Sequence, residues 1–428
     1  MKMNRLFLWV AIDMCVLTAH AQTRKISIDE IDSLVARRNL QLQAARMDVS
    51  DAEGQLQQAK KYANPELQVM HNVQNPINKK WFDFGYDGET DVQISQPIAI
   101  GGQHRNKVKQ AQAMLNAYKA AFDVALLDAV YNARITFVDL YGTQQKLKVY
   151  DKEIASVEKI LQAYKLLSSK GNESKMSTLR IAAMLNELRS EKTEMQATEN
   201  NYQQQLHVLL NIKGEKPIET QMEDDAIIST VIDTSLKLRP FVTQSDSALF
   251  YSIIDKYPEM VQLTHLKESA WYALKQERAE ALPHITLNGE WDKNGSIGHN
   301  FFAVGATLTL PLWNRNQGNI RSARALYSKA GIEQKQKESE LTEAFLSTYN
   351  SMLNNLKLVE EQRVDIVSEV DNMIDATEEQ FMKRNISLME FVDMYSSYRN
   401  TKFQVLDAKI QLVKQNEELN RFIKRGQL

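Results

Sequence analysis

The sequence has little cysteine, proline and glycine: its 428 residues include 1 Cys, 8 Pro and 15 Gly. Proline and glycine together make roughly 5% of the chain, against an average usage of about 12%, so turns are scarce and the elements between them are long. No apolar run reaches the roughly 18 residues of a transmembrane helix, which excludes a helical membrane bundle but not a β-barrel. Lys and Arg number 52 against 54 Asp and Glu, so no net positive charge attracts nucleic acid.

The first 21 residues have the pattern of an export signal. Lys2 and Arg5 precede a mostly apolar stretch over 6–18, and Ala-His-Ala at 19–21 matches a small-x-small cleavage site. Cys15 lacks the preceding small residue that a lipoprotein signal needs, so we expect cleavage after position 21 and no lipid anchor. The mature chain then has no thiol, which excludes disulfides, cysteine nucleophiles and cysteine-ligated metals. A buried first helix is the alternative interpretation.

The prolines divide the rest of the chain into helical and extended parts. Two proline-free runs, 98–216 and 312–428, each predict long helices. In the first run, apolar residues have the spacing of an amphipathic or coiled-coil seam at Leu147, Ile154, Val157, Leu161 and Tyr164. A short polar turn interrupts each run, at 168–174 and at 383–387. Each run therefore predicts a helical hairpin, whose arms of about 60 residues would reach roughly 90 Å.

The similar lengths of the two runs indicate an internal duplication. Sliding the sequence by 218 residues superimposes four pairs without a gap: Arg38 on Lys256, Leu42 on Met260, Ala52 on Ala270 and Pro65 on Pro283. Further along, the Pro-Ile pair at 97–98 matches the Pro-Leu pair at 311–312 after a small difference in length. A chance periodicity of helical Ala and Leu does not easily produce prolines in the same order, so we expect two structural repeats.

Between the paired prolines of each repeat, over 66–98 and 284–312, the hydrophobic period changes from helical to two. The alternation is clearest in the second repeat, where one face carries Ile285, Leu287 and Trp291. We expect four strands in two hairpins, each strand about 9 to 11 residues long, as a tilted strand needs to cross a bilayer. The alternative is an ordinary hairpin that caps a soluble helical domain. Four strands cannot close a barrel, so a membrane barrel would be shared between subunits.

These features, in this order, resemble the TolC family of outer-membrane efflux proteins. The resemblance covers essentially the whole mature chain and is carried by Ser-Gln-Pro-Ile at 95–98, Gly-Gly at 101–102, Ala-x-Ala at 111–113, Leu-Pro-Leu at 310–312, Arg-Asn-x-Gly-Asn at 315–319 and Ala-x-Ala at 323–325. It implies a mainly α-helical protein with a small membrane β part. In that family a homotrimer closes a shared 12-stranded β-barrel, four strands per subunit, which continues as an α-helical barrel in the periplasm.

The repeats and the resemblance together predict the domain order. A signal peptide over 1–21 comes first, and an equatorial linker over 213–247 separates the two structural repeats. The first repeat covers 22–212, with a β-hairpin at 66–98 and a long helical hairpin at 103–212. The second repeat covers 248–428, with a β-hairpin at 284–312 and a long helical hairpin at 318–424.

Two acidic residues follow the second polar turn. Ser387 and Glu390 have the spacing of a capping box that restarts the last helix, and Asn385 is expected in the left-handed conformation before it. Asp393 lies three residues beyond Glu390, so both carboxylates share one helix face. The resemblance implies that these two positions form the pore gate, where three copies would disfavour anions, hold cations and raise some carboxyl pKa values. The alternative is that they only stabilise the helix dipole.

The turns themselves are candidate partner sites. The resemblance implies that Gly171 and Ser174 in the first turn, with Asn385 and Ser387 in the second, contact a periplasmic adaptor (membrane fusion) protein. The family's usual glycine is replaced in the second turn, at 384–385, so the geometry of that turn has to differ in detail. The alternative is a pair of solvated turns without a partner.

The sequence contains no H-E-x-x-H, no P-loop and no dinucleotide-binding glycine motif, and its histidines are not paired at metal-ligand spacing. We therefore predict no enzymatic activity, no cofactor and no metal site. The predicted function is an outer-membrane channel, embedded in outer-membrane lipid with a periplasmic helical tunnel. It would be the passive exit duct of a tripartite efflux system with a periplasmic adaptor and an inner-membrane pump of the proton-driven RND type. Heavy-metal cation efflux is favoured over drug efflux, and a periplasmic structural or adhesive coiled-coil protein without channel activity is the alternative.

Overall fold

The structure is a computed structural model, which describes residues 24–212, 216–222, 229–236, 238, 253–295, 297–363 and 366–423. The export signal expected over 1–21 lies outside these residues, as does much of the linker expected over 213–247. Most of the described chain is helical, as the sequence predicts. No helix in these ranges is both long enough and apolar enough to cross a membrane.

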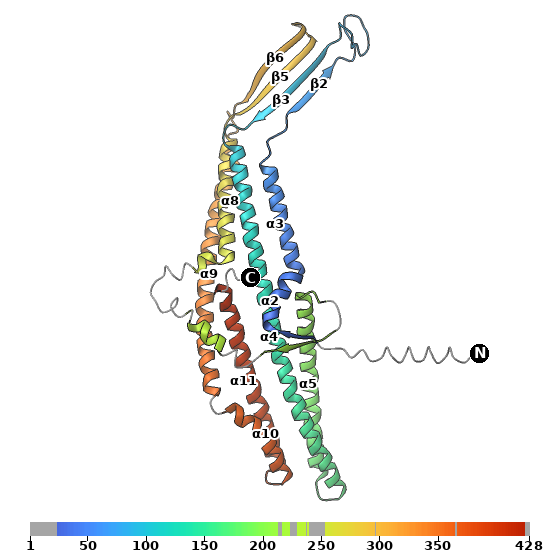
Figure 1. Cartoon of the computed structure of the whole chain (residues 1–428), viewed down its shortest axis with the longest axis vertical. Helices are drawn as coiled ribbons and strands as arrows, with labels where there is room; N and C mark the ends of the chain where they lie inside the picture. Colours follow the sequence, from blue (N-terminus) through green and yellow to red (C-terminus); the bar gives the residue numbers. More distant parts are fainter. Residues whose placement is uncertain are drawn as a thin grey trace, which may run out of the picture. The chain divides into compact units, whose positions relative to one another are not determined.

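The first half of the described chain contains a β-hairpin followed by a long helical hairpin (Figure 1). Its elements are β1 (Arg24–Ser27), α2 (Ile28–Arg38), α3 (Leu40–Ala59), β2 (Glu66–His71), β3 (Thr90–Ile98), α4 (Gln103–Ser169), α5 (Lys175–Leu209) and β4 (Ile218–Gln221). The arms of the helical hairpin are unequal, because α4 has 67 residues and α5 only 35. Helix α5 ends early since Asn211 adopts a φ of 45°, and Pro217 precedes the extended segment β4.

The second half repeats this order. Its elements are α8 (Pro258–Glu280), β5 (His284–Gly295), β6 (Gly298–Thr309), α9 (Gln317–Arg363), α10 (Ile366–Met382) and α11 (Leu388–Ile423). The second proline-free run therefore contains three helices, where the sequence predicts two, and residues 364–365 between α9 and α10 lie outside the described chain. The turn between α10 and α11 falls at the predicted position.

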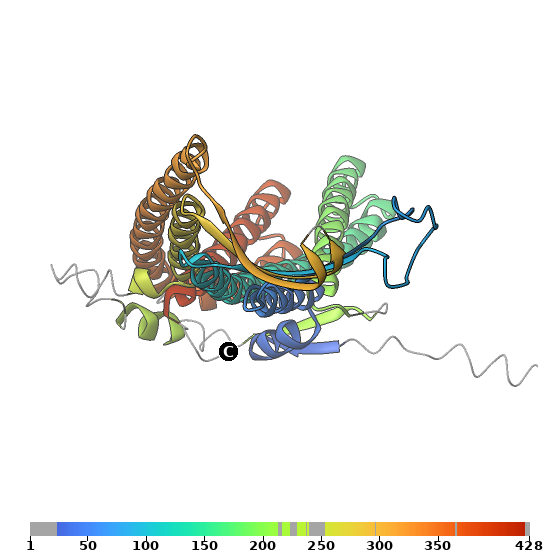
Figure 2. The same ribbon diagram turned by 90° about the horizontal axis from the view of Figure 1, so that it is seen from above.

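The four strands of the two β-hairpins form one antiparallel sheet in the order β2-β3-β5-β6 (Figures 1 and 2). The hairpins join through β3 and β5, where Val92 lies opposite Trp291. Strand β2 has 6 residues, fewer than expected, while β6 has 12. The ladder of β2 ends early because the buried Asn75 binds the loop backbone instead: its side chain accepts from Ile77 N–H at 2.9 Å and donates to the Asp87 carbonyl at 2.8 Å.

One face of this sheet is apolar and uncovered in the single chain. The register places Val69, Val92, Trp291 and Phe302 across it from β2 to β6. Val69 is 60% exposed, Phe302 74% and Val304 93%. The opposite face carries polar residues at the neighbouring positions, among them Gln68, Gln93, Glu290 and Asp292. The period of two in the sequence therefore reflects a real division into an apolar and a polar face.

The chain divides into two compact units. The first comprises Met1–Gln43, Ala125–Ile254 and Leu341–Leu428, and the second comprises Ala44–Val124 and Asp255–Glu340. The second unit contains the four-stranded sheet. Each unit takes segments from both halves of the sequence, so the units cut across the predicted repeats.

The first unit has a hydrophobic core to which α4, α5, α10 and α11 all contribute. Its buried members are Tyr150, Val157, Ile160, Leu161, Ile181, Leu185, Leu188, Ile374, Phe381, Phe391, Tyr395 and Tyr398. Burial of apolar side chains, at about 25 cal/mol per Å², makes this cluster a force that holds the two helical hairpins together. It also includes Leu161 and Val157 of the predicted coiled-coil seam.

A buried arginine connects three helices of the same unit. Arg134 in α4 donates from Nε to Asp32 in α2 at 2.6 Å and from Nη1 to both carboxylate oxygens of Glu417 in α11 at 3.0 Å. The Arg134 and Glu417 side chains are only 8% and 9% exposed. Beside this network, β1 and β4 form a two-stranded parallel sheet. Neither feature follows from a local sequence pattern.

In the second unit, α4 and α9 begin with the same local structure. The Gln103 side chain accepts a hydrogen bond from Gly101 N–H at 2.8 Å, and the Gln317 side chain accepts one from Arg315 N–H at 2.8 Å. The residue between donor and acceptor has a positive φ in both places, 83° at Gly102 and 56° at Asn316.

Candidate functional site at the turns of the helical hairpins

The turn between α4 and α5 is a Schellman motif. Gly171 has a φ of 74°, its N–H donates to the Ser168 carbonyl at 3.1 Å, and Asn172 N–H donates to the Leu167 carbonyl at 2.9 Å. Glycine suits this position because it has no Cβ, and the left-handed conformation therefore causes no steric clash. The two hydrogen bonds satisfy carbonyls at the end of α4 and reverse the chain within a few residues.

Ser174 then begins α5 as its N-cap. Its hydroxyl oxygen accepts a hydrogen bond from Met176 N–H at 3.1 Å. Gly171 and Ser174 are both exposed, as the sequence predicts for the tip of a hairpin. Met176 is 73% exposed and Leu179 64%, so this tip also presents apolar side chains to solvent.

The turn between α10 and α11 has the same hydrogen bonds. Arg384 N–H donates to the Phe381 carbonyl at 3.0 Å, and Asn385 N–H donates to the Gln380 carbonyl at 2.9 Å. The left-handed residue is Arg384, with a φ of 62°, so the prediction that Asn385 takes this conformation is wrong. The Schellman motif requires the positive φ at the first residue past the helix, and Asn385 follows that residue. The Asn385 side chain instead donates to Gln380 Oε1 at 2.7 Å.

The predicted capping box at the start of α11 is present. Ser387 N–H donates to Glu390 Oε2 at 2.7 Å, and Glu390 N–H donates to Ser387 Oγ at 3.2 Å. Hydrogen bonding to the Glu390 carboxylate, first from the Ser387 backbone N–H and then from the Ser387 side chain, holds the pKa of that carboxyl below its usual value. Glu390 is therefore a carboxylate at neutral pH, held close to the turn.

Glu390 and Asp393 lie on the exposed side of α11. Phe391 and Tyr395, on the same turns of the helix, are 0% and 1% exposed in the core of the first unit. The two carboxylates therefore share a face that points away from this core. The single chain places them on its surface close to the turn.

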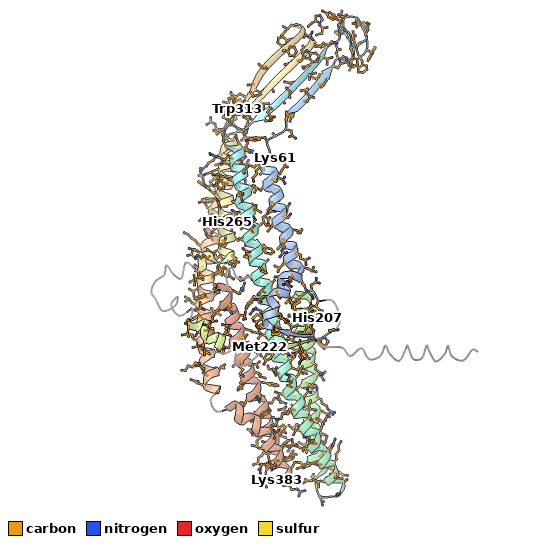
Figure 3. The ribbon with its side chains drawn as sticks, in the orientation of Figure 1. Lys61, His207, Met222, His265, Trp313 and Lys383 are labelled. Atoms are coloured by element: carbon orange, nitrogen blue, oxygen red, sulfur yellow. The ribbon has the colours of Figure 1, made fainter. Side chains whose placement is uncertain are left out.

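An ion pair joins the two turns. Arg384 Nη2 lies 3.1 Å from Glu173 Oε1, and the side chains are 61% and 20% exposed. Sequence reasoning misses this contact, although the opposite charges at matching places in the two turns are a usable signal. Figure 3 marks the second turn by Lys383, whose ammonium pairs with Glu379 one helical turn back.

Aromatic rings pack behind both turns. Tyr164 of α4 stacks on Phe381 of α10 with ring centroids 5.4 Å apart, and Phe381 stacks on Phe391 of α11 at 4.4 Å. Phe391 in turn contacts Tyr395 at 4.4 Å. This column gives the turns a rigid base, since such aromatic pairs contribute about 0.5 to 1.5 kcal/mol beyond their buried area.

Within the described ranges, no group of three or more His, Cys, Asp or Glu side chains is placed to hold a metal ion. A cavity of about 980 Å³ in the first unit lies away from both turns. Polar and charged side chains from β1, β4, α4 and α11 line it, among them Lys148, Glu219, Asn416 and Glu417.

Comparisons with known proteins agree on one family. Residues 33–214 match the family described as outer membrane efflux protein. The cobalt-zinc-cadmium resistance protein CzcC of Cupriavidus metallidurans is 21% identical over 331 residues, which cover 76% of this chain and 73% of that protein. The outer membrane efflux protein BepC of Brucella suis is 19% identical over 328 residues, 74% of this chain and 67% of that protein.

Solved structures of channel proteins share the fold. CusC superimposes with a TM-score of 0.74 at 14% identity, over 92% of this chain and 91% of that chain. The CmeC outer membrane channel of Campylobacter jejuni superimposes with a TM-score of 0.75 at 13% identity, over 92% of this chain and 85% of that chain. The likeness therefore extends through both hairpins and the four-stranded sheet.

Proposed function

Because this chain belongs to the TolC family of outer membrane efflux proteins, we propose that it is the outer-membrane exit duct of a tripartite efflux system. The observation that carries the proposal is the fold match over 92% of the chain to outer-membrane channels. The helical hairpins would form the periplasmic tunnel and the four-stranded sheet would cross the outer membrane. The protein would conduct substrates passively, without chemistry of its own.

The sheet supports assembly as a trimer. Within the described residues, β2 and β6 are the sheet edges, so their outer backbone groups are free to pair with another copy. The exposed apolar face fits a lipid environment and the polar face fits a water-filled lumen. Since a bilayer does not tolerate open sheet edges, we propose that three copies pair β2 with β6 and close a barrel of twelve strands.

Two pairs of equivalent local structures support the duplication. Both helical hairpins turn through the same Schellman motif, at Gly171 and at Arg384. Both long helices, α4 and α9, begin with a glutamine that binds the backbone two residues earlier. We propose that the repeats over 22–212 and 248–428 arose by duplication, with the linker over 213–247 between them, and these matching backbone geometries support the proposal.

We propose that Glu390 and Asp393 form the periplasmic gate. Both are exposed, both lie at the start of α11, and the capping box fixes the position of Glu390. Around a three-fold axis the two positions would supply six carboxylates, which would favour cations over anions in a narrow opening. Repulsion between them would raise some of their pKa values, against the lowering by Ser387 in the single chain.

We propose that the turns at Gly171 and Ser174, and at Asn385 and Ser387, dock on a periplasmic adaptor. Their support is exposure together with the apolar side chains around them, since Met176, Leu179 and Met389 are 64% to 73% exposed. Such clusters at a rigid tip are typical of protein-binding surfaces. The adaptor would connect the channel to an inner-membrane pump of the proton-driven RND type. The similarity to CzcC favours metal cations as the exported substrate.

Three measurements on one preparation test the proposal. We expect the protein in the outer-membrane fraction of cells, a trimer by mass in detergent, and ion conductance in planar bilayers. A monomer or dimer that stays soluble without detergent and carries no current would instead support the periplasmic coiled-coil protein. A trimer without conductance would support the proposed trimeric assembly but contradict the proposed channel activity.

A further inference from the structure

A buried acidic residue lies in the helical core well away from the proposed gate. The Glu153 side chain in α4 is 1% exposed, and neither of its carboxylate oxygens has a hydrogen-bond partner within the described chain. A buried charge without such partners is costly, because transfer from water to an apolar interior is strongly unfavourable. The position of Glu153 in α4 therefore favours the protonated, neutral form of its carboxyl.

One arginine lies within ion-pair distance of two acidic residues from different helices. Arg399 Nη1 in α11 lies 2.9 Å from Glu191 Oε2 in α5 and 3.6 Å from Glu153 Oε2. The guanidinium is therefore closer to Glu191, and Glu153 receives the weaker contact. The Tyr150 ring packs under Arg399, 5.8 Å from its guanidinium carbon, and closes this side of the cluster.

The neighbouring charges are engaged elsewhere. Among the groups on the facing turns, Lys192 pairs with Asp151, Arg189 with Glu158 and Lys152 with Asp375. Tyr395 of α11 also lies near Glu153, and its hydroxyl is 2.6 Å from Ser156 Oγ, which donates to Glu378 of α10. The groups that act on Glu153 are thus Arg399 and Glu191, with Tyr150 and Tyr395 beside them.

The pKa of Glu153 is raised to about 7: burial raises it most, Arg399 partly offsets that increase, and Glu191 adds to it. Burial and the nearby Glu191 raise the pKa of Tyr150 to about 12, so this phenol keeps its proton at neutral pH. Protonated Glu153 leaves one positive and one negative charge in the cluster. Ionised Glu153 adds a second negative charge to the same guanidinium.

We propose that Glu153, Arg399 and Glu191 form a proton-sensitive contact between α4, α5 and α11. While Glu153 carries its proton, the two helical hairpins pack closely. Loss of the proton places an unbalanced carboxylate in the core and loosens α11 against α4 and α5. The proposal concerns the packing of the helices and does not depend on channel activity.

The direction of the pH effect follows from linkage. The folded chain binds the Glu153 proton more tightly than the unfolded chain, in which the carboxyl has its ordinary pKa near 4.5. Packing at this contact is therefore strongest below about pH 4.5, weakens as the pH rises towards about 7, and is weakest above it. From these two pKa values the folding equilibrium changes on the order of a hundred-fold between the extremes.

Hydrogen exchange of peptides from α11, corrected for the intrinsic rate, tests the proposal on the full-length protein at pH 5.5 and pH 8. We expect wild-type protection to fall on the order of ten-fold at the higher pH. Glu153→Gln keeps the shape without the charge, so its protection should be the same at both values. Glu158→Gln, on the exposed side of the same helix, is the matched control and should behave as wild type.

Infrared spectroscopy supplies a second measurement that reports the proton itself. The wild type should show a protonated-carboxyl band that disappears between pH 5.5 and pH 8, and this change should be missing in Glu153→Gln. Glu191→Gln leaves Arg399 to Glu153 alone, so it should lower the pKa of Glu153 and move both transitions to lower pH. Identical exchange and infrared profiles for wild type and Glu153→Gln would overturn the proposal.

Discussion

Arg384 occupies a backbone position that glycine usually fills. Its φ of 62° costs about 1 kcal/mol in a residue with a Cβ, while its exposed ion pair with Glu173 returns less than about 1 kcal/mol. The chain therefore uses an unfavourable residue at the second turn, where Gly171 serves without strain in the first. The side chain at 384 connects the two turns, which a glycine could not do.

This balance predicts an order of stability among variants of Arg384. Arg384→Gly and Arg384→Ala both lose the ion pair, but only the alanine variant keeps the left-handed strain. We expect Arg384→Gly to be more stable than Arg384→Ala by about 1 kcal/mol, measured by reversible unfolding of the purified protein in denaturant. Equal stability of the two variants would show that the turn does not hold a positive φ in solution.

The acidic pair on α11 gives the second prediction at the scale of residues. Replacing both Glu390 and Asp393 with Ala should raise single-channel conductance by roughly two-fold or more and reduce cation selectivity, because six carboxylates would leave the constriction. Planar-bilayer recording measures both quantities. The matched control replaces Glu360 and Glu361, an exposed acidic pair on α9, and should leave conductance unchanged. Equal currents from the two double variants would contradict the gate.

At the scale of elements, Arg134 determines how α2, α4 and α11 are held together. Arg134→Met should destabilise the first unit by about 3 to 5 kcal/mol, because Asp32 and Glu417 are left as unpaired carboxylates around a buried side chain. Denaturant unfolding measures the loss. Adding Asp32→Asn and Glu417→Gln to the same variant removes the uncompensated charges and should recover most of the stability. If Arg134→Met were as stable as the wild type, the Arg134 network would contribute little to the stability of the first unit.

The sequence predicts the elements better than the contacts between them. Period-two alternation finds β5 and β6, and polar turns locate both hairpin tips, because these signals are local. The pairing of β1 with β4 joins segments about 190 residues apart, so no local pattern announces it. Glu153 lies beside the predicted seam residue Ile154, and only the packing of α5 and α11 makes it a buried residue.

In the candidate site, too, the sequence predicts local contacts better than contacts between distant segments. The capping box of Ser387 and Glu390 was predictable because its two members are three residues apart in sequence. Conformational propensity favours Asn over Arg for a left-handed residue and so predicts Asn385, but the hydrogen bonds of the motif require the positive φ one position earlier, at Arg384. The contact between Arg384 and Glu173 joins two hairpins and depends on their packing.

At the scale of the whole molecule, the single cysteine of the sequence, Cys15, makes a direct test of how copies assemble possible. In a Cys15→Ser background, cysteines at Val69 in β2 and at Val304 in β6 lie on the same apolar face but at opposite edges of the sheet. Three strand spacings of about 4.8 Å separate these edges within one chain, which is too far for a disulfide. A bond between the two positions therefore has to join neighbouring copies.

We expect oxidation to convert this variant into a covalent trimer on a denaturing gel. Because the register between copies is not fixed by the single chain, Val69→Cys is combined in turn with Phe302→Cys, Val304→Cys and Ala306→Cys, which alternate along β6. Gly305→Cys is the control, since its side chain points to the opposite face of the sheet. Cross-linked dimers alone, or equal cross-linking at 304 and 305, would contradict a closed barrel, because closure gives each β2 edge one partner β6 edge in a single register.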